Sequence, residues 1–241
     1  MTPAGRPRFE TTRWSLVLAA GGSHPSAARE ALAALCDTYW YPLYGYVRRQ
    51  GHDADQARDA VQAFILMLLE RDDFRGLRPE RGRFRAFLLV SLRHFLESRR
   101  LHDRALKRGG GEPPPLPLEF GTAESRYLLE PAGAGTPETV FDRNWALAVL
   151  DQVFQRIRKE WEAKGKGAEF DRLKDCLMGE LPAGGYRALA LDLGSTEAAT
   201  KMAVLRLKRR FQQELRSEIA DTVTDDAVDD ELRYLLKALQ T

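Results

Sequence analysis

Apolar residues recur at steps of three and four along most of the chain, which is the period of an amphipathic helix. In residues 25–51 this pattern predicts a helix that Pro42 bends or interrupts and that Gly51 ends. Further helices are predicted within residues 53–74, 84–108, 137–165, 168–181, 186–215 and 224–241. Strand-like alternation with hairpin turns is missing, so the pattern predicts an all-α fold.

Local signals mark the ends of several of these helices. Asp53 suits an N-cap, and Thr136 followed by Pro137 matches an N-cap with a first-turn proline. Residues 109–139 are instead rich in Gly and Pro and have no sustained period, which is typical of a linker. The expected parts are an N-terminal extension (1–26), a helical domain (27–108), a linker (109–139), a second helical domain (140–223) and a C-terminal extension (224–241). The alternative is a single helical domain with a long surface loop.

Residues 186–215 have the pattern of a helix-turn-helix. Ala190 lets the two helices approach closely, Gly194 in the bend is expected to take a positive φ, and Thr196 suits an N-cap for the second helix. The inner faces are formed by Tyr186, Leu189 and Leu193 and by a stripe of Thr200, Val204, Leu207, Phe211 and Leu215. Basic residues occupy other faces of the second helix, which suits a DNA-reading helix but equally a solvated amphipathic helix.

A second basic segment precedes the predicted linker. Between Arg71 and Arg108 the chain has eleven arginines and one lysine against five acidic residues. Phenylalanines are interleaved with these cations, an arrangement that suits single-stranded nucleic acid because bases can stack on the rings. The simpler interpretation is that the phenylalanines are core residues. The arginines are harder to explain as internal ion pairs, because they outnumber the acidic residues nearby by about two to one.

Composition excludes several classes of protein. The 37 basic and 35 acidic residues leave a net charge of +2, so the overall charge does not indicate a nucleic-acid partner. The longest apolar run, residues 64–69, is too short for a membrane span, and no signal peptide is recognisable, so a cytoplasmic location is expected. Cys36 and Cys176 are expected to be buried free thiols. No catalytic, phosphate-binding or metal-binding pattern is present, so neither an enzymatic activity nor a cofactor or metal is expected.

Several segments together resemble a known family. They are "TRWSLVLAA", "ALCDTYWYPLYGYVRR", "DAVQAFILMLLE", "PERGRFRAFLLVSLRHFL", "RALKRGGG", "LALDLGSTEAATKMAVLRLKRRF" and "EIADTV". In this order they are similar to bacterial RNA polymerase sigma factors of the extracytoplasmic-function group. The resemblance implies that residues 27–108 form sigma region 2 and residues 140–223 sigma region 4. It also implies binding to core RNA polymerase and promoter DNA, with region 2 melting the −10 element and region 4 placing a helix in the −35 element.

The resemblance assigns roles to individual residues. The positions implied to bind core polymerase are Asp55, Asp59, Gln62, Phe64 and Glu70, with Ala63 where the family usually has an acid. The positions implied to contact the −10 element are Arg93, His94, Arg99, Arg100, Arg104, Lys107 and Arg108. Those implied to contact the −35 element are Thr196, Glu197, Ala199, Thr200, Lys201 and Arg206, with Lys208, Arg209 and Arg210 on phosphates. Thr200 and Leu205 depart from the residues usual in the family.

Three hypotheses follow from the sequence. The first is a sigma factor that confers promoter specificity without performing chemistry. The second is a stand-alone helix-turn-helix transcriptional regulator that binds duplex DNA without polymerase. The third is a helical enzyme, which the absence of a catalytic constellation disfavours. Control by an anti-sigma factor, by a regulatory kinase or by the terminal extensions is left open.

Overall fold

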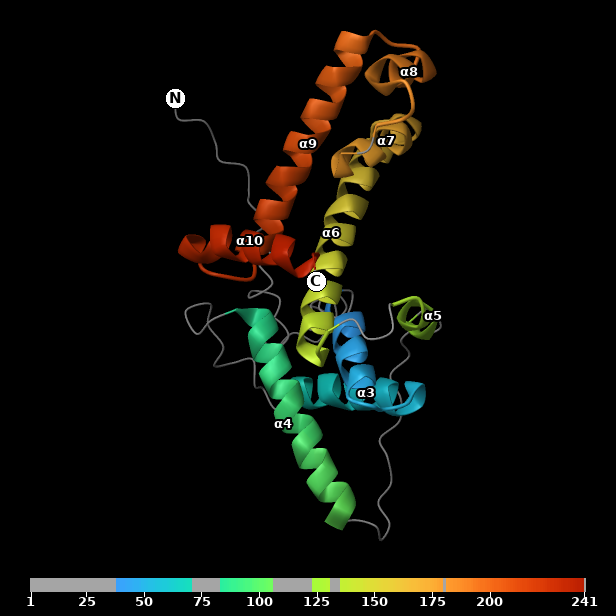
Figure 1. Cartoon of the computed structure of the whole chain (residues 1–241). Helices are drawn as coiled ribbons and strands as arrows, with labels where there is room; N and C mark the ends of the chain where they lie inside the picture. The colour runs from blue at the N-terminus through green and yellow to red at the C-terminus, as the bar shows by residue number, and fades with distance from the viewer. Residues whose placement is uncertain (1–37, 71–82, 106–122, 131–134, 180, 241) are drawn as a thin grey trace. The chain divides into compact units, whose positions relative to one another are not determined.

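Every regular element that the computed structural model describes is a helix, which confirms the predicted all-α fold (Figure 1). The structure describes residues 38–70, 83–105, 123–130, 135–179 and 181–240. After a helix over residues 38–49, the elements are α3 (Ala54–Glu70), α4 (Phe84–Ala105), α5 (Ala123–Leu128), α6 (Pro137–Ala163), α7 (Gly167–Leu173), the 3₁₀ helix η2 (Lys174–Met178), α8 (Gly185–Asp192), α9 (Glu197–Ala220), the 3₁₀ helix η3 (Asp225–Ala227) and α10 (Val228–Ala238). Among the described helices, none is both long and apolar enough to cross a membrane.

The chain divides into two compact units along lines that differ from the expected ones. The first unit contains the described residues up to Ala148 together with those from Ile219 onward, and the second unit is Val149–Glu218. The beginning of α6 and the whole of α10 therefore belong with α3 and α4. The expected boundary in residues 109–139 and the separate C-terminal extension are not the divisions that the packing produces.

The helix over residues 38–49 continues through Pro42 rather than being interrupted there. Proline removes one backbone hydrogen bond, but Leu43 and Tyr46 beside it are almost fully buried, and that packing offsets the loss. Gly51 ends the helix with φ of +92°, as predicted. Gly45 allows a close approach, because a Cβ atom there would lie 2.8 Å from Asn144 Nδ2 of α6.

Helices α3 and α4 supply most of the remaining core of the first unit. Asp53 caps α3, because its Oδ1 accepts a hydrogen bond from Gln56 N at 2.8 Å while Gln56 Oε1 accepts from Asp53 N at 3.2 Å. The two helices meet at Phe64 and Phe95, whose ring centroids lie 5.7 Å apart. Buried residues of α4 recur every four positions, at Phe84, Leu88, Leu92 and Leu96.

Helix α5 corrects the expectation that residues 109–139 lack regular structure. It packs on the helix over residues 38–49, where Arg48 pairs with Glu124 at 2.8 Å and Arg126 lies 4.0 Å from the ring centre of Tyr41. Tyr41 also donates a hydrogen bond to Glu130 at 2.6 Å. Aromatic and charged contacts therefore hold this segment in place, although its sequence has no apolar period. Residues 106–122 and 131–134 lie outside the described residues.

A buried ion-pair cluster joins α10 to α4 and α6 within the first unit. Arg85 of α4 donates to Glu231 of α10 at 2.7 Å and to Asp142 of α6 at 2.6 Å. Its guanidinium lies between aromatic rings, 3.9 Å from the centre of Tyr234 and 4.9 Å from that of Trp145. The Glu231 side chain is only 1% exposed. The C-terminal helix is therefore an integral part of the first unit.

The second unit has its own hydrophobic core. The buried residues are Val153, Ile157, Phe170, Leu173, Cys176, Leu189, Ala203, Val204 and Leu207, contributed by α6, α7, η2, α8 and α9. Ion pairs flank this core, with Arg156 of α6 donating to Glu218 of α9 at 2.8 Å and to Glu214 at 3.2 Å. These contacts fix α9 against α6 inside the unit and leave the opposite side of α9 uncovered.

Candidate nucleic-acid interface

Helices α8 and α9 meet at a tight bend that has the features predicted from the sequence. Gly194 takes φ of +60°, while Ser195 N donates to Ala190 O at 2.8 Å and Gly194 N donates to Leu191 O at 3.2 Å. This pair of bonds is the Schellman motif that commonly ends a helix. Thr196 then caps α9, accepting a hydrogen bond on Oγ1 from Ala199 N at 3.2 Å. Figure 1 shows the short α8 and the long α9 on either side of the bend.

The inner face of α9 follows the predicted stripe. Val204 and Leu207 are buried, and Phe211 and Leu215 pack against the same core. Thr200 is also buried, at 1% exposure, and its Oγ1 has no hydrogen-bond partner among the described residues. The implied contact of Thr200 with the −35 element is therefore not compatible with this structure. The side chain faces the core because Thr200 lies one helical turn before Val204 on the same face.

The outward face of α9 combines Arg209, which the resemblance places on a phosphate, with apolar residues to which it gives no DNA contact. Ala198, Met202, Leu205 and Arg209 lie opposite the buried stripe, at successive steps of four, three and four. All four are exposed. Their spacing could have identified them, because an outward face is the complement of the predicted stripe.

The basic residues of α9 divide into paired and unpaired ones. Lys201 pairs with Glu197 at 2.6 Å, and its hydrogen bond lowers the pKa of that carboxyl. Arg210 pairs with Glu160 of α6 at 2.5 Å and with Glu214 at 2.7 Å, so these two acids compete with any phosphate for its guanidinium. Within the described part of the chain, Arg206 and Arg209 are exposed and have no ion-pair partner. Lys208 is half-buried.

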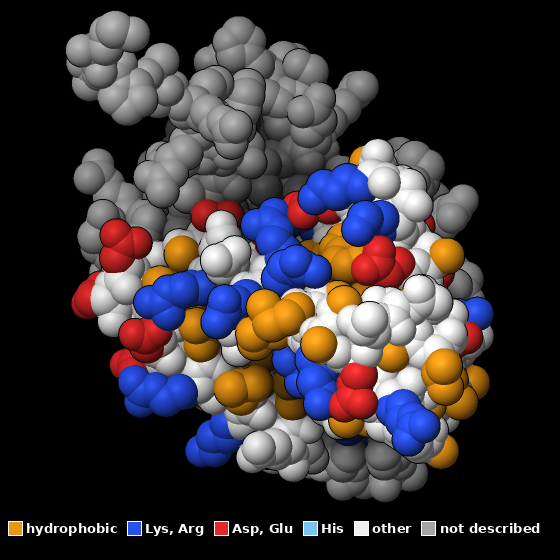
Figure 2. All heavy atoms as spheres, turned by 90° about the horizontal axis from the view of Figure 1, so that it is seen from above, with side chains coloured by type: hydrophobic (Ala, Val, Ile, Leu, Met, Phe, Trp, Pro, Cys, Tyr) orange, Lys and Arg blue, Asp and Glu red, His pale blue; other side chains and the backbone are white. Residues whose placement is uncertain are grey.

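A hollow lies beside the bend between α8 and α9. Its volume is ≈ 580 Å³, and its lining includes Glu169, Arg172, Ser195, Ala199 and Arg206. Ala199, implied to contact DNA, is thus exposed at its edge. Figure 2 looks at the molecule from the side on which α8 and the beginning of α9 lie in Figure 1, and basic side chains lie next to hydrophobic ones on this face.

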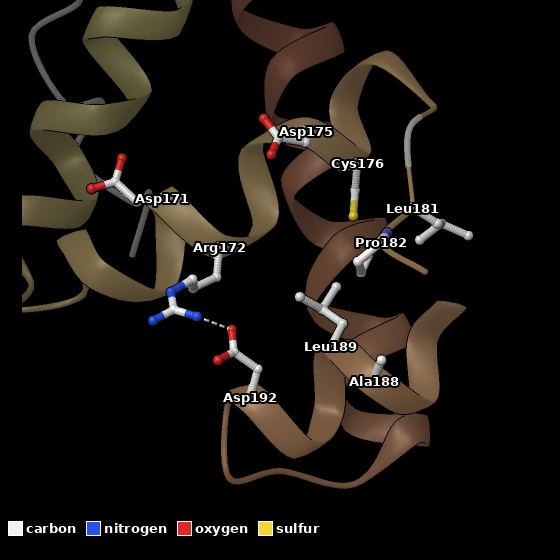
Figure 3. Close-up of a pocket in the computed structure, with 9 residues that line it drawn as sticks. All are labelled: Asp171, Arg172, Asp175, Cys176, Leu181, Pro182, Ala188, Leu189 and Asp192. Carbon is white, nitrogen blue, oxygen red and sulfur yellow. Dashed lines mark hydrogen bonds and ion pairs between the residues drawn. The ribbon is translucent and has the colours of Figure 1, made fainter. Parts of the chain in front are cut away.

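A second hollow of ≈ 430 Å³ lies between α7, η2 and α8 (Figure 3). Leu189 and Cys176 lie on its apolar side, while Arg172 and Asp192 form an ion pair on its polar side. Cys176 is a buried free thiol, as predicted, and burial raises its pKa. Such a thiol is a poor nucleophile, since the thiolate is the reactive form. Cys36 lies outside the described residues.

The residues implied to contact the −10 element are not equally available. His94 and Arg100 are exposed on α4, and Arg99 is half-buried. Arg93 donates to Tyr46 Oη at 3.2 Å and to Glu138 Oε1 at 2.8 Å, and these two contacts raise its pKa. Arg93 therefore already has two hydrogen-bond partners within the first unit. Arg104 lies on α4 but its side chain is outside the described atoms, and Lys107 and Arg108 lie outside the described residues.

The residues implied to bind polymerase lie on α3 but not on one surface. Asp55 and Asp59 are exposed, and Asp55 pairs with Arg58. Phe64 is 0% exposed and Gln62 6%, although they lie on different sides of α3, so the first unit covers more than one face of this helix. The implied contact through Gln62 and Phe64 is therefore not compatible with this structure. The side chain of Glu70 is not described.

No group of three or more His, Cys, Asp or Glu side chains among the described residues could hold a metal ion. Two exposed cations without an ion-pair partner among the described residues, Arg206 and Arg209, lie on α9, which follows a well-defined bend. Comparisons of the chain with protein-family models, with curated proteins and with solved structures find no match.

Proposed function

We propose that the chain is a promoter-specificity subunit that binds core RNA polymerase in the cytoplasm and directs it to promoter DNA. In this proposal α9 enters the major groove of the −35 element and the exposed residues of α4 contact the −10 element. The subunit performs no chemistry itself. The proposal rests on the resemblance of the sequence and on one structural observation in particular.

That observation is the combination of a helix-turn-helix geometry with free cations on α9. A recognition helix must keep its inner face against the domain while its outer face and cations remain available for DNA. Arg206 and Arg209 meet this requirement, because they are exposed and have no ion-pair partner within the described residues. Arg206 suits a base-edge or phosphate contact, since a guanidinium donates in pairs to either acceptor.

A second candidate function is a transcriptional regulator that uses the α8–α9 pair without polymerase. The burial of Gln62 and Phe64 favours it, because two of the five implied polymerase contacts are covered by the first unit. The exposed Asp55 and Asp59 favour the first proposal, since they leave an acidic surface on α3 for a basic partner.

The decisive experiment measures duplex binding and transcription with and without bacterial core RNA polymerase. Random duplexes are incubated with the chain alone, with core polymerase alone and with both, and the bound sequences are determined. We expect a defined sequence and run-off transcripts only when both proteins are present. Sequence-specific binding by the chain alone, without transcripts, would support the regulator. No sequence selection under any condition would contradict both candidates.

The variant Arg206→Ala tests the role of α9 in either case. A bidentate contact to a base is worth about 1–3 kcal/mol, so affinity for the selected duplex should fall between about fivefold and 150-fold. Arg233→Ala is a matched control, because Arg233 is also exposed but lies on α10, where it pairs with Asp230 at 2.6 Å. Equal effects of the two variants would show that Arg206 contributes only general charge.

A further inference from the structure

The centre of the outward face of α9 is apolar. Ala198, Met202 and Leu205 follow one another there, and Met202 is 51% and Leu205 40% exposed. The first hydrogen-bonding side chain in this row is Arg209, one turn beyond Leu205. Side chains at the start of a recognition helix are those that reach the base edges. Within this row, Ala198, Met202 and Leu205 can make apolar contacts but cannot donate or accept hydrogen bonds, whereas Thr196, Glu197 and Lys201 beside it can.

Cations flank the apolar row on both sides. On α9, Lys201 lies on one flank and Arg206 on the other, while Arg209 continues the row itself. Among the described residues, Arg206 and Arg209 have no ion-pair partner. Lys201 pairs with Glu197, so the matching surface is apolar in the middle and anionic where it meets Arg206 and Arg209.

The major groove of DNA offers such a surface. Phosphates line both edges of the groove, and thymine alone among the four bases presents a methyl group on its floor. The row from Ala198 to Leu205 extends about 10 Å along the helix, which corresponds to about three base pairs at 3.4 Å each. Met202 and Leu205 can therefore face neighbouring base pairs while the flanking cations meet the two phosphate strands.

On the basis of the proposed function, we propose that Met202 and Leu205 recognise the 5-methyl groups of thymine in the major groove. The chain then selects duplexes with thymine at two or three neighbouring positions, and it distinguishes thymine from uracil, which lacks only the methyl group. Arg206 and Arg209 hold the helix in register on the phosphates.

The test removes the methyl groups without changing base pairing. The duplex selected by the complete chain, with core polymerase if it is required, is synthesised again with uracil in place of each thymine in the region that α9 contacts. Binding of both duplexes is measured for the unaltered chain and for the double variant Met202→Ala/Leu205→Ala. Leu191→Ala is the control, since Leu191 is an exposed leucine of the same unit on α8.

Each contacted methyl group should contribute about fourfold in affinity, which corresponds to ~0.8 kcal/mol. With two or three contacted methyl groups, we expect the unaltered chain and Leu191→Ala to bind the thymine duplex about sixteenfold to sixtyfold more tightly than the uracil duplex. The double variant should bind both duplexes equally, because a double-mutant cycle isolates the contact between side chain and methyl. A thymine preference that survives in the double variant would overturn the inference.

Two other results separate this inference from the proposed function. If the unaltered chain binds the thymine and uracil duplexes equally but remains sequence-specific, the methyl inference is wrong and the proposed function stands. If no duplex is selected with or without polymerase, both are wrong. In that event the apolar row is available to be tested as a surface for a protein.

Discussion

Particular arginines on two basic helices of this protein occupy contrasting environments. On α4, Arg85 is buried in a cluster with Asp142 and Glu231, and Arg93 donates to Glu138 and Tyr46. On α9, Arg206 and Arg209 are exposed, and within the described part of the chain they have no ion-pair partner. A dense run of arginines in a sequence can therefore serve the interior of a unit or a binding surface, and the run itself does not distinguish the two.

The difference arises from where the acidic partners lie in the sequence. The acidic residues that pair with Arg85 and Arg93 lie between 45 and 146 positions away in the sequence. A count of the acidic residues close to α4 therefore missed them. The excess of arginines over nearby acids was therefore weak evidence for nucleic-acid binding by α4. On α9 only Arg210 among the three consecutive basic residues 208–210 is paired across to α6.

The sharpest test of the structural role on α4 is the variant Glu231→Gln. It removes the charge that faces Arg85 while leaving a side chain of the same shape. Breaking a buried ion pair typically costs about 3–5 kcal/mol, and because Arg85 keeps its contact with Asp142, we expect the lower end of this range, about 3 kcal/mol. The free energy of unfolding, measured by urea titration of the complete chain, should fall by about this amount for the first unit.

The neighbouring variant Asp230→Asn is the matched control for Glu231→Gln. Asp230 and Arg233 form an exposed pair on the same helix, and exposed pairs contribute about 0–1 kcal/mol. We expect its unfolding curve to be close to that of the unaltered chain. If Glu231→Gln cost no more than Asp230→Asn, the buried cluster would not stabilise the unit, and the contrast between α4 and α9 would be lost.

Thr200→Val sharpens the assignment of the two faces of α9. The Thr200 hydroxyl is buried without a partner among the described residues, so replacing it by a methyl group removes the cost of burying it. That cost is about 1–3 kcal/mol, and we expect the second unit to become more stable by about 1 kcal/mol. Thermal unfolding followed by circular dichroism measures the change. Unchanged stability with weakened DNA binding would place Thr200 on the outward face instead.

Adjacent arginines on α9 allow a direct comparison of a free and a paired cation. Arg209→Ala should lower the slope of log affinity against log salt by about one, because one phosphate contact is lost, and stability should change by no more than about 0.5 kcal/mol. Arg210→Ala should leave the slope unchanged and lower stability by up to about 1 kcal/mol, since it removes contacts with Glu160 and Glu214. If Arg210→Ala lowered the salt slope and Arg209→Ala lowered the stability, Arg210 would be the phosphate contact and Arg209 the structural residue.

Local sequence signals predicted the ends of helices well. Asp53, Thr136 and Thr196 cap their helices, and Gly194 takes the positive φ of the bend, because each of these features depends only on residues a few positions away. The alternation of buried and exposed positions on α9 also follows from the helical period alone. The helical period predicted the inner stripe, and the outward row of Ala198, Met202 and Leu205 could have been derived from it as the complement.

Long-range packing could not be predicted in the same way. Helix α5 lies in a Gly- and Pro-rich stretch, and it is held on residues 38–49 by contacts such as Arg126 over Tyr41 rather than by an apolar period. Helix α10 belongs to the first unit because Glu231 meets Arg85 across 146 positions. Neither contact has a signature in one sequence, because each depends on which distant elements the fold brings together.

The smallest predicted effect is a pH dependence in the second unit. The hydrogen bond from Arg210 lowers the pKa of Glu160 below its ordinary value of 4.5, so ionised Glu160 stabilises the folded state. This contribution is fully present above about pH 4.5 and is lost as the pH falls through the lowered pKa. Because the pair is about one-third exposed, it contributes no more than about 0.5 kcal/mol. Glu160→Gln should therefore be slightly less stable than the unaltered chain at neutral pH, and the two stabilities should converge in acid. If the variant remained less stable than the unaltered chain at low pH, Glu160 would act through packing and not through its charge. Arg210 would then resemble Arg206 and Arg209 in having no stabilising ion pair.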